Sequence, residues 1–153
     1  MIRNSKFVKL TQIKNTFLFI FFLLYIFSCE PRETENSHYK ISFENNSNKN
    51  LYLFWSSDTI LTQYGTPDPR NNPDRKVLAH SINNDALRSN GGKPESWETM
   101  FKSYPKISVF VFDEQILLNN DWQTIKENGM YLKRYDLNYD DVKNSNWTIK
   151  HTD

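Results

Sequence analysis

The folded part of the chain opens with a strict alternation of apolar and polar residues. In "YKISFEN", residues 39–45, every second side chain is apolar, which is the period-two pattern of a half-buried β-strand. The next apolar stretch, "LYLFW" at 51–55, is apolar on both faces and predicts a second, more central strand. The intervening "NSNKN" consists of residues that favour turns. We therefore expect the two strands to pair as a β-hairpin.

Four later segments also have the composition of strands. "KISVFVFDE" at 106–114 is the strongest of them and is expected to be central, because it is apolar at 107 and at 109–112. "MYLKRYDL" at 130–137 and "WTIKH" at 147–151 predict two more strands, and "KVLAHSI" at 76–82 predicts a short one. "NNDALRSNGG" at 83–92 is polar and ends in two glycines, so we expect a loop there.

Three segments are typical of short helices. "PESWETMFKSY" begins at Pro94, and its aromatic residues recur at i, i+4 and i+7, which makes one apolar stripe. "NDWQTIKENG" is expected to be capped by Asn120 and stopped by Gly129. "NYDDVKNSN" can be capped by Asn138, with two aspartates in its first turn. Strands and short helices together predict an α+β fold, a mainly β domain with a few short helices.

Between residues 56 and 76 the periodicity is lost. Three prolines in this segment each remove a backbone donor, which excludes regular strand pairing. A connection this long in a compact domain is often functional, although a solvated proline-rich loop is the more economical interpretation. The side chains best suited to a contact loop are Tyr64, Arg70 and Arg75.

The first 28 residues have the layout of an export signal. Residues 1–16 carry four basic side chains and no acid, and an apolar run follows from Phe17 to Phe27. Eleven apolar residues are too few for a membrane-spanning helix, which needs roughly 20. Lys14 prevents the run from being extended backwards. A cleaved signal is therefore favoured over a retained anchor.

The segment "IFSC", residues 26–29, resembles the lipobox of bacterial lipoproteins, although Phe27 is bulkier than the usual occupant of its position. The resemblance implies that Cys29 becomes the first residue of the mature protein and receives a thioether-linked diacylglycerol, usually with an amide-linked acyl chain. One acyl chain is a marginal anchor, whereas two or three hold a protein firmly on a membrane. The alternative is a free, oxidisable thiol, which is less economical because Cys29 is the only cysteine of the chain.

Residues 29–38 are expected to form a flexible tether. After the cysteine, "EPRETENS" is acidic and has no apolar side chain other than proline, so it cannot pack into a core. Acidic residues behind a lipidated cysteine also resemble the surface-export signal of Bacteroidota lipoproteins. The resemblance implies anchoring in the outer membrane, and it favours the cell surface over the periplasmic face.

Charge and cysteine content narrow the class of protein further. Without residues 1–28, fifteen Lys and Arg stand against eighteen Asp and Glu, a net charge of −3. That balance gives no electrostatic reason to expect nucleic acid as a partner. With no disulfide framework, the 125 remaining residues must rely on a hydrophobic core, and residues 39–153 have the length of one domain.

A second resemblance covers roughly residues 39–150. "SWETMF", "ISVFVFDEQIL" and above all "LKRYDLNYDDVKNSNWTI" are similar to a family of small uncharacterised Bacteroidota lipoproteins. The family carries no known activity, substrate or catalytic residue, so the resemblance implies a lipoprotein and nothing about chemistry.

Residues able to perform catalysis are few. There is no G-x-S-x-G nucleophile elbow. His38 at the tether boundary and His151 in the tail are expected to be solvated, and His80 to be partly buried in a hydrogen-bonded structural role. Carboxylate pairs occur at Glu95 with Glu98 and at Asp113 with Glu114, but such neighbours are common and a sugar-cleaving cleft needs more chain than this. We expect no enzyme and no cofactor.

A metal site is also not expected. "DLNYDD" places Asp136, Asn138 and Asp140 at the first three ligand positions of an EF-hand loop. The pattern then fails, because Asp141 stands where the loop needs glycine and Trp147 where it needs a bidentate glutamate. These acids are better explained as helix-start residues.

The sequence therefore predicts a non-catalytic envelope lipoprotein that acts as a binding or accessory module, held to the membrane through Cys29, with an envelope protein as its candidate partner. The alternative is a structural or stress-related envelope protein without a dedicated ligand, and a small hydrolase is a distant third. One modification motif is present: "DTI" at 58–60 resembles the O-glycosylation acceptor of exported Bacteroidota proteins, with Thr59 as the attachment site.

Overall fold

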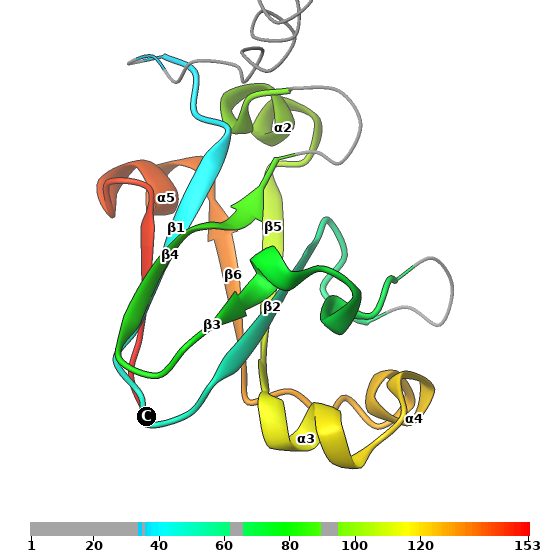
Figure 1. Ribbon diagram of the computed structural model, residues 1–153. Coiled ribbons are helices and arrows are strands. Elements are labelled where there is room, and N and C mark those ends of the chain that lie inside the picture. Colours follow the sequence, from blue (N-terminus) through cyan, green and yellow to red (C-terminus); the bar gives the residue numbers. More distant parts are fainter. Residues whose placement is uncertain (1–33, 35, 62–65, 90–94) are drawn as a thin grey trace, which may run out of the picture. The chain divides into compact units, whose positions relative to one another are not determined.

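A computed structural model of the chain describes residues 34, 36–61, 66–89 and 95–153, which belong to the compact unit Glu33–Asp153 (Figure 1). The strands are β1 (Lys40–Asn45), β2 (Leu51–Ser56), β3 (Lys76–Val77), β4 (Ser81–Arg88), β5 (Lys106–Asp113), β6 (Lys133–Asn138) and β7 (Thr148–His151). The α-helices are α2 (Trp97–Ser103), α3 (Glu114–Asn119), α4 (Trp122–Glu127) and α5 (Tyr139–Asn144), and the 3₁₀ turns are η1 (Pro69–Asn71) and η2 (Pro73–Arg75). The predicted α+β, mainly β fold is confirmed. The export signal, Cys29 and Tyr64 lie outside the described residues.

The strands form two sheets, and the predicted hairpin between β1 and β2 is wrong. One sheet has the order β4-β1-β7 and the other β3-β2-β5-β6, so the first two strands belong to different sheets. The alternation along β1 specifies which face is buried but not which strand is its neighbour. The turn is held elsewhere: the Asn45 side chain donates to the carbonyl oxygens of Lys49, 2.8 Å, and Leu78, 2.9 Å. These bonds stabilise the loop through which the chain passes from one sheet to the other.

Residues 83–88, predicted as part of a loop, belong to β4. This strand pairs antiparallel with β1, with a register shift between Ile41 and Phe43. Polar side chains are accommodated in β4 by hydrogen bonds. Asn83, for example, donates to two main-chain oxygens, each at 2.8 Å. Pairing with a buried neighbour therefore outweighs the weak strand propensity of the sequence. β7 pairs with the other edge of β1 in parallel.

The central strand β5 is buried on both faces, as its composition predicts. Ile107, Val109 and Val111 point into a core between the two sheets, which also holds Trp97 of α2. The alternate residues Phe110 and Phe112 lie in a second core. Because successive side chains of a strand point to opposite faces, one apolar strand supplies both cores. The second core is closed by Leu117 of α3 and Ile125 of α4.

The three predicted helices are confirmed as α2, α4 and α5. The cap of α4 is Asp121 rather than Asn120, and its Oδ1 accepts from the Thr124 amide at 2.9 Å. Gly129 follows that helix with φ 58°, as expected of a helix stop. Asn138 caps α5 in a reciprocal capping box with Asp141. α3 was not predicted; Asp113 caps it directly after β5.

Figure 1 shows α2 at one end of the strands and α3 with α4 at the other. Within the part of the chain that the structure describes, none of the helices combines the length and apolarity that crossing a membrane requires.

Candidate functional site

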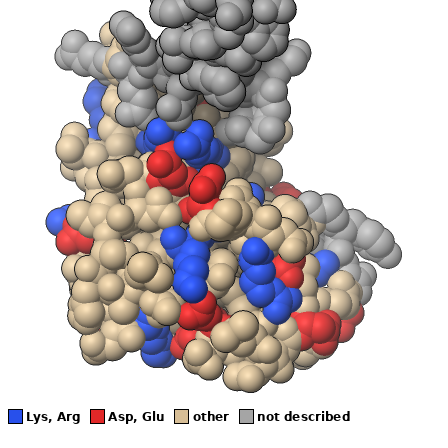
Figure 2. Space-filling view, viewed as in Figure 1, with Lys and Arg blue, Asp and Glu red and all other residues tan. Residues whose placement is uncertain are grey.

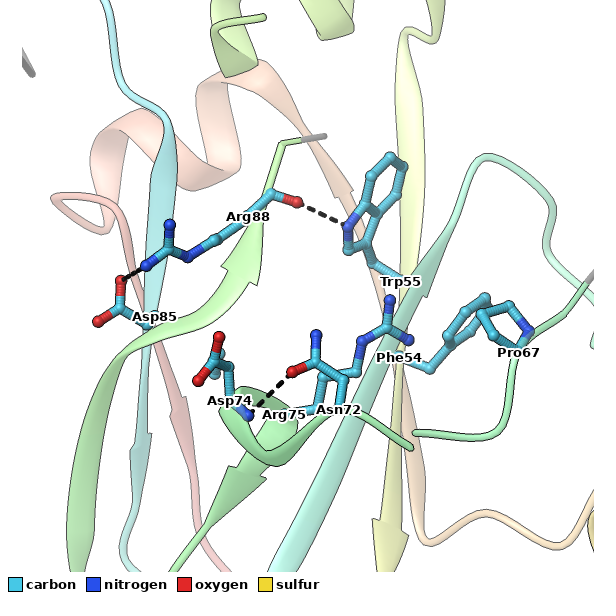
Figure 3. A pocket seen from close by; sticks show the side chains of 9 residues that line it. Phe54, Trp55, Pro67, Asn72, Asp74, Arg75, Asp85 and Arg88 are labelled. Carbon is cyan, nitrogen blue, oxygen red and sulfur yellow. Dashed lines mark hydrogen bonds and ion pairs between the residues drawn. The ribbon is translucent and has the colours of Figure 1, made fainter. Parts of the chain in front are cut away.

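A pocket of about 290 Å³ opens between the two sheets, where β4 and β2 diverge (Figure 3). Three segments line it: Phe54 and Trp55 from β2, Asn72, Asp74 and Arg75 from the η2 turn, and Asp85, Ala86 and Arg88 from β4, with Pro67 at the rim. Its volume is at the lower limit of ligand sites, which are roughly 300–1,000 Å³.

The η2 turn is shaped by its own sequence. Pro73 occupies the first position of the turn, where the missing N–H costs nothing. The Asn72 side chain accepts from the Asp74 amide at 3.0 Å, which fixes the turn from its other side. The bond uses the Asn72 oxygen, so its amide nitrogen points up into the pocket (Figure 3). "NPDR" is therefore a preformed unit that presents an amide and then an arginine.

Arg75 is the distinctive side chain of the pocket. Its guanidinium carbon lies 5.0 Å from the centre of the Phe54 ring, a cation–π arrangement. Its Nη1 atom is buried and has no hydrogen-bond partner. Burial lowers the pKa of the Arg75 guanidinium. Among the described residues no carboxylate pairs with this cation, which is unusual because buried charges are normally paired.

The second arginine of the pocket is held differently. Arg88 Nη2 lies 2.9 Å from Asp85 Oδ1, and Figure 3 shows its guanidinium turned towards that carboxylate. Asp85 also binds Lys40 Nζ at 2.9 Å. The hydrogen bond from Lys40 is the main reason why the pKa of Asp85 lies below its ordinary value. The pocket thus holds one carboxylate shared by two cations, and one cation that has no acidic partner among the described residues.

Trp55 supplies a fixed apolar wall. Its Nε1 donates to the Arg88 carbonyl oxygen at 3.0 Å, joining β2 to the end of β4. Its ring meets Trp97 in an edge contact with centroids 5.1 Å apart. With the ring anchored on two sides, the wall is set before any ligand arrives.

Of the three predicted contact-loop residues, Tyr64 lies outside the described residues, and Arg70 and Arg75 have different roles. Arg70 is structural: it forms an ion pair with Asp68 at 2.5 Å, and its Nη1 donates to the Leu117 carbonyl oxygen. These bonds tie the loop to the end of α3. Arg75 instead lines the pocket. Thr59 is exposed, in the irregular segment after β2, and its carbonyl oxygen accepts from Arg134.

The histidine predictions are partly wrong. His151 is 3% exposed rather than solvated, and its Nδ1 lies 2.9 Å from the Tyr135 hydroxyl. His38 is also held, with its ring stacked on Trp147 at a centroid distance of 4.0 Å. His80 has the expected hydrogen-bonded role, with Nε2 2.9 Å from Asn48 Oδ1, but it is exposed rather than partly buried.

The carboxylate pairs tested for catalysis have separate structural partners. Glu98 binds His38, and Asp113 caps α3 by accepting from the Gln115 amide at 2.8 Å. Glu114 pairs with Lys76. Over the described ranges, no group of three or more His, Cys, Asp or Glu side chains converges as a metal site would require.

Charges of both signs are interspersed on the face shown in Figure 2, where Lys and Arg lie beside Asp and Glu. The face presents no broad basic surface.

Apart from Arg75, the pocket residues were missed by sequence reasoning, because three distant segments contribute them. The one local signal was the proline turn that ends in an arginine, "NPDR". No family model, no curated protein and no solved structure matches this chain.

Proposed function

We propose that this chain is a lipid-anchored envelope lipoprotein whose domain acts as a non-catalytic binding module, with the pocket between β2 and β4 as its binding site. The observation that supports binding is the half-buried guanidinium of Arg75, which lines an open pocket and has no acidic partner among the described residues. A cation held in this way has lost hydration, and an incoming anion can restore its interactions.

Several features favour binding over catalysis. The described lining contains no His, Cys, Ser or Tyr, the side chains that most often act as nucleophile or base. Asp85 is ionised and engaged by Lys40 and Arg88, so it is poorly placed to deliver a proton. What remains is a rigid aromatic wall, an amide and a cation, which are groups that hold a ligand.

Anchoring is proposed through lipid on Cys29, at the outer membrane and preferably on its outer face. Replacing Cys29 with Ala should abolish incorporation of radioactive fatty acid by producing cells, and the variant should leave the membrane fraction. Label that persists in the variant contradicts the anchor and leaves the pocket proposal intact.

The binding role is tested with the full-length protein, purified from gently solubilised envelopes and analysed by mass spectrometry for whatever stays bound. Wild type is compared with Arg75→Met, which keeps the length of the side chain and removes the charge. Arg134→Met is the matched control, since Arg134 is paired with Asp136 and does not line the pocket.

A ligand or partner that accompanies wild type and Arg134→Met but not Arg75→Met supports the proposal. Identical, solitary preparations of all three proteins would overturn it and favour a structural envelope protein without a dedicated ligand. A partner held equally by all three would place binding elsewhere on the surface.

A further inference from the structure

Resting on the proposed binding role, we infer that the pocket selects a small ligand with one carboxylate and an apolar body, the carboxylate lying on Arg75 and the body against Trp55. The two halves of this statement come from two independent parts of the pocket.

The carboxylate follows from the geometry of Arg75. A guanidinium is a planar fork that matches the two oxygens of a carboxylate. Arg75 lines the pocket with its Nη1 atom buried and without a hydrogen-bond partner, and the ring of Phe54 lies against the guanidinium. The amide of Asn72 points into the same space as the Arg75 guanidinium and can donate a further hydrogen bond (Figure 3).

The aspartates of the pocket disfavour an anion that carries more than one negative charge. Asp74 and Asp85 line the same pocket, and the Asp74 side chain forms no ion pair with any described residue. A phosphate carries close to two negative charges at neutral pH and would be repelled more strongly by Asp74, since Asp85 is already paired with Lys40 and Arg88. A single carboxylate is repelled less, and an N–H group on the ligand can donate to Asp74.

The apolar body follows from the remaining wall. Phe54, Trp55, Ala86 and Pro67 give the pocket an apolar side, and the Trp55 ring is anchored by its hydrogen bond to Arg88 and its contact with Trp97. Ligand sites generally combine such a wall with a few polar groups that fix orientation. The volume of about 290 Å³ restricts the ligand to a small molecule.

The experiment uses a matched pair of probes, N-acetyl-L-phenylalanine as its carboxylate and the corresponding neutral amide. Both have the same apolar body and the same N–H group. Binding to the full-length protein in detergent is followed by tryptophan fluorescence, with Trp55 as the reporter. We expect the carboxylate to bind at least tenfold more tightly than the amide.

The variants separate charge from shape. Arg75→Met should remove the preference for the carboxylate, and Arg75→Lys should weaken carboxylate binding at least fivefold because it lacks the fork. Arg134→Met, which removes a paired arginine outside the pocket, should keep the preference. Near-ultraviolet circular dichroism identical to wild type shows that each variant is folded.

Equal binding of the two probes by wild type, or a preference that survives in Arg75→Met, overturns the inference. The inference is also overturned if neither probe binds to the wild-type protein. If the co-purification described above still yields a ligand that depends on Arg75, the binding role stands and only the ligand class is wrong. If it yields none, the binding role itself fails.

Discussion

Glu98 holds His38 at two points. One oxygen of its carboxylate lies 2.6 Å from the His38 ring Nδ1, and the other accepts from the His38 main-chain amide at 3.0 Å. The His38 carbonyl oxygen in turn accepts from the Trp97 amide at 2.7 Å. Helix α2 is therefore hydrogen-bonded to the segment just before β1.

Removing the Glu98 contacts to His38 should make the segment before β1 less stable. Glu98→Ala leaves the His38 amide without its acceptor and should lower the free energy of unfolding by about 1–2 kcal/mol. Limited proteolysis should then cut near Tyr39 faster than in wild type. Glu98→Gln retains an acceptor and serves as the control. Equal cleavage of wild type and Glu98→Ala would show that the Trp97 hydrogen bond and the stacking on Trp147 suffice to hold this segment.

The two arginines of the 56–76 loop should respond oppositely to the same substitution. Arg70→Met loses bonds to Asp68 and to the end of α3, and should cost about 1–3 kcal/mol of stability. Arg75→Met replaces an unpaired, half-buried cation with an apolar side chain and should raise the free energy of unfolding by about 1 kcal/mol. Denaturant unfolding of both variants measures the difference. A clear loss of stability in Arg75→Met would mean that its contact with Phe54 outweighs the cost of burying the charge.

His151 should make stability depend on pH. Burial, assisted by Lys133 and Lys49, lowers the pKa of His151 below the ordinary value of 6.5. Between that lowered pKa and 6.5 the unfolded chain binds the proton more readily than the folded one, so this contribution to stability is complete above about pH 6.5 and declines as the pH falls. Thermal unfolding between pH 7.5 and 5 measures the decline.

The matched variant for this effect is His151→Phe. It keeps a ring in the core, and the Tyr135 hydroxyl has the Lys150 carbonyl oxygen at 3.4 Å as an alternative acceptor. The melting temperature of this variant should fall less than that of wild type over the same pH range. Parallel profiles for the two proteins would assign the decline to other groups.

Gly129 should tolerate no side chain without cost. Its φ of 58° belongs to the left-handed region, although an added Cβ would meet only Tyr131 at 3.7 Å, an ordinary contact. Gly129→Ala should therefore lower the free energy of unfolding by about 1 kcal/mol, from backbone conformation alone. Gly129→Asn should cost less, since asparagine adopts this conformation more readily. A larger loss in both variants would point to crowding rather than to φ.

These residues also show how far the sequence can be interpreted unaided. β5 was predictable because its apolar side chains at 109–112 suit a strand that is buried on both faces. α5 was predictable because its cap depends only on the nearby residues Asn138 and Asp141. β4 was not, since its polar residues form a strand only when β1 offers a partner. The pocket was hidden for the same reason: Trp55, Arg75 and Arg88 are separated along the chain and meet only through the pairing of strands.

The parallel contact between β7 and β1 has a consequence for when the domain can form. The first strand of the fold has one of its two edges covered by the last strand, residues 148–151. A chain still emerging from the ribosome leaves that edge unpaired until residues 148–151 are available. Contacts between such distant segments also form slowly. The sheet β4-β1-β7 can therefore be completed only after residues 148–151 have been synthesised.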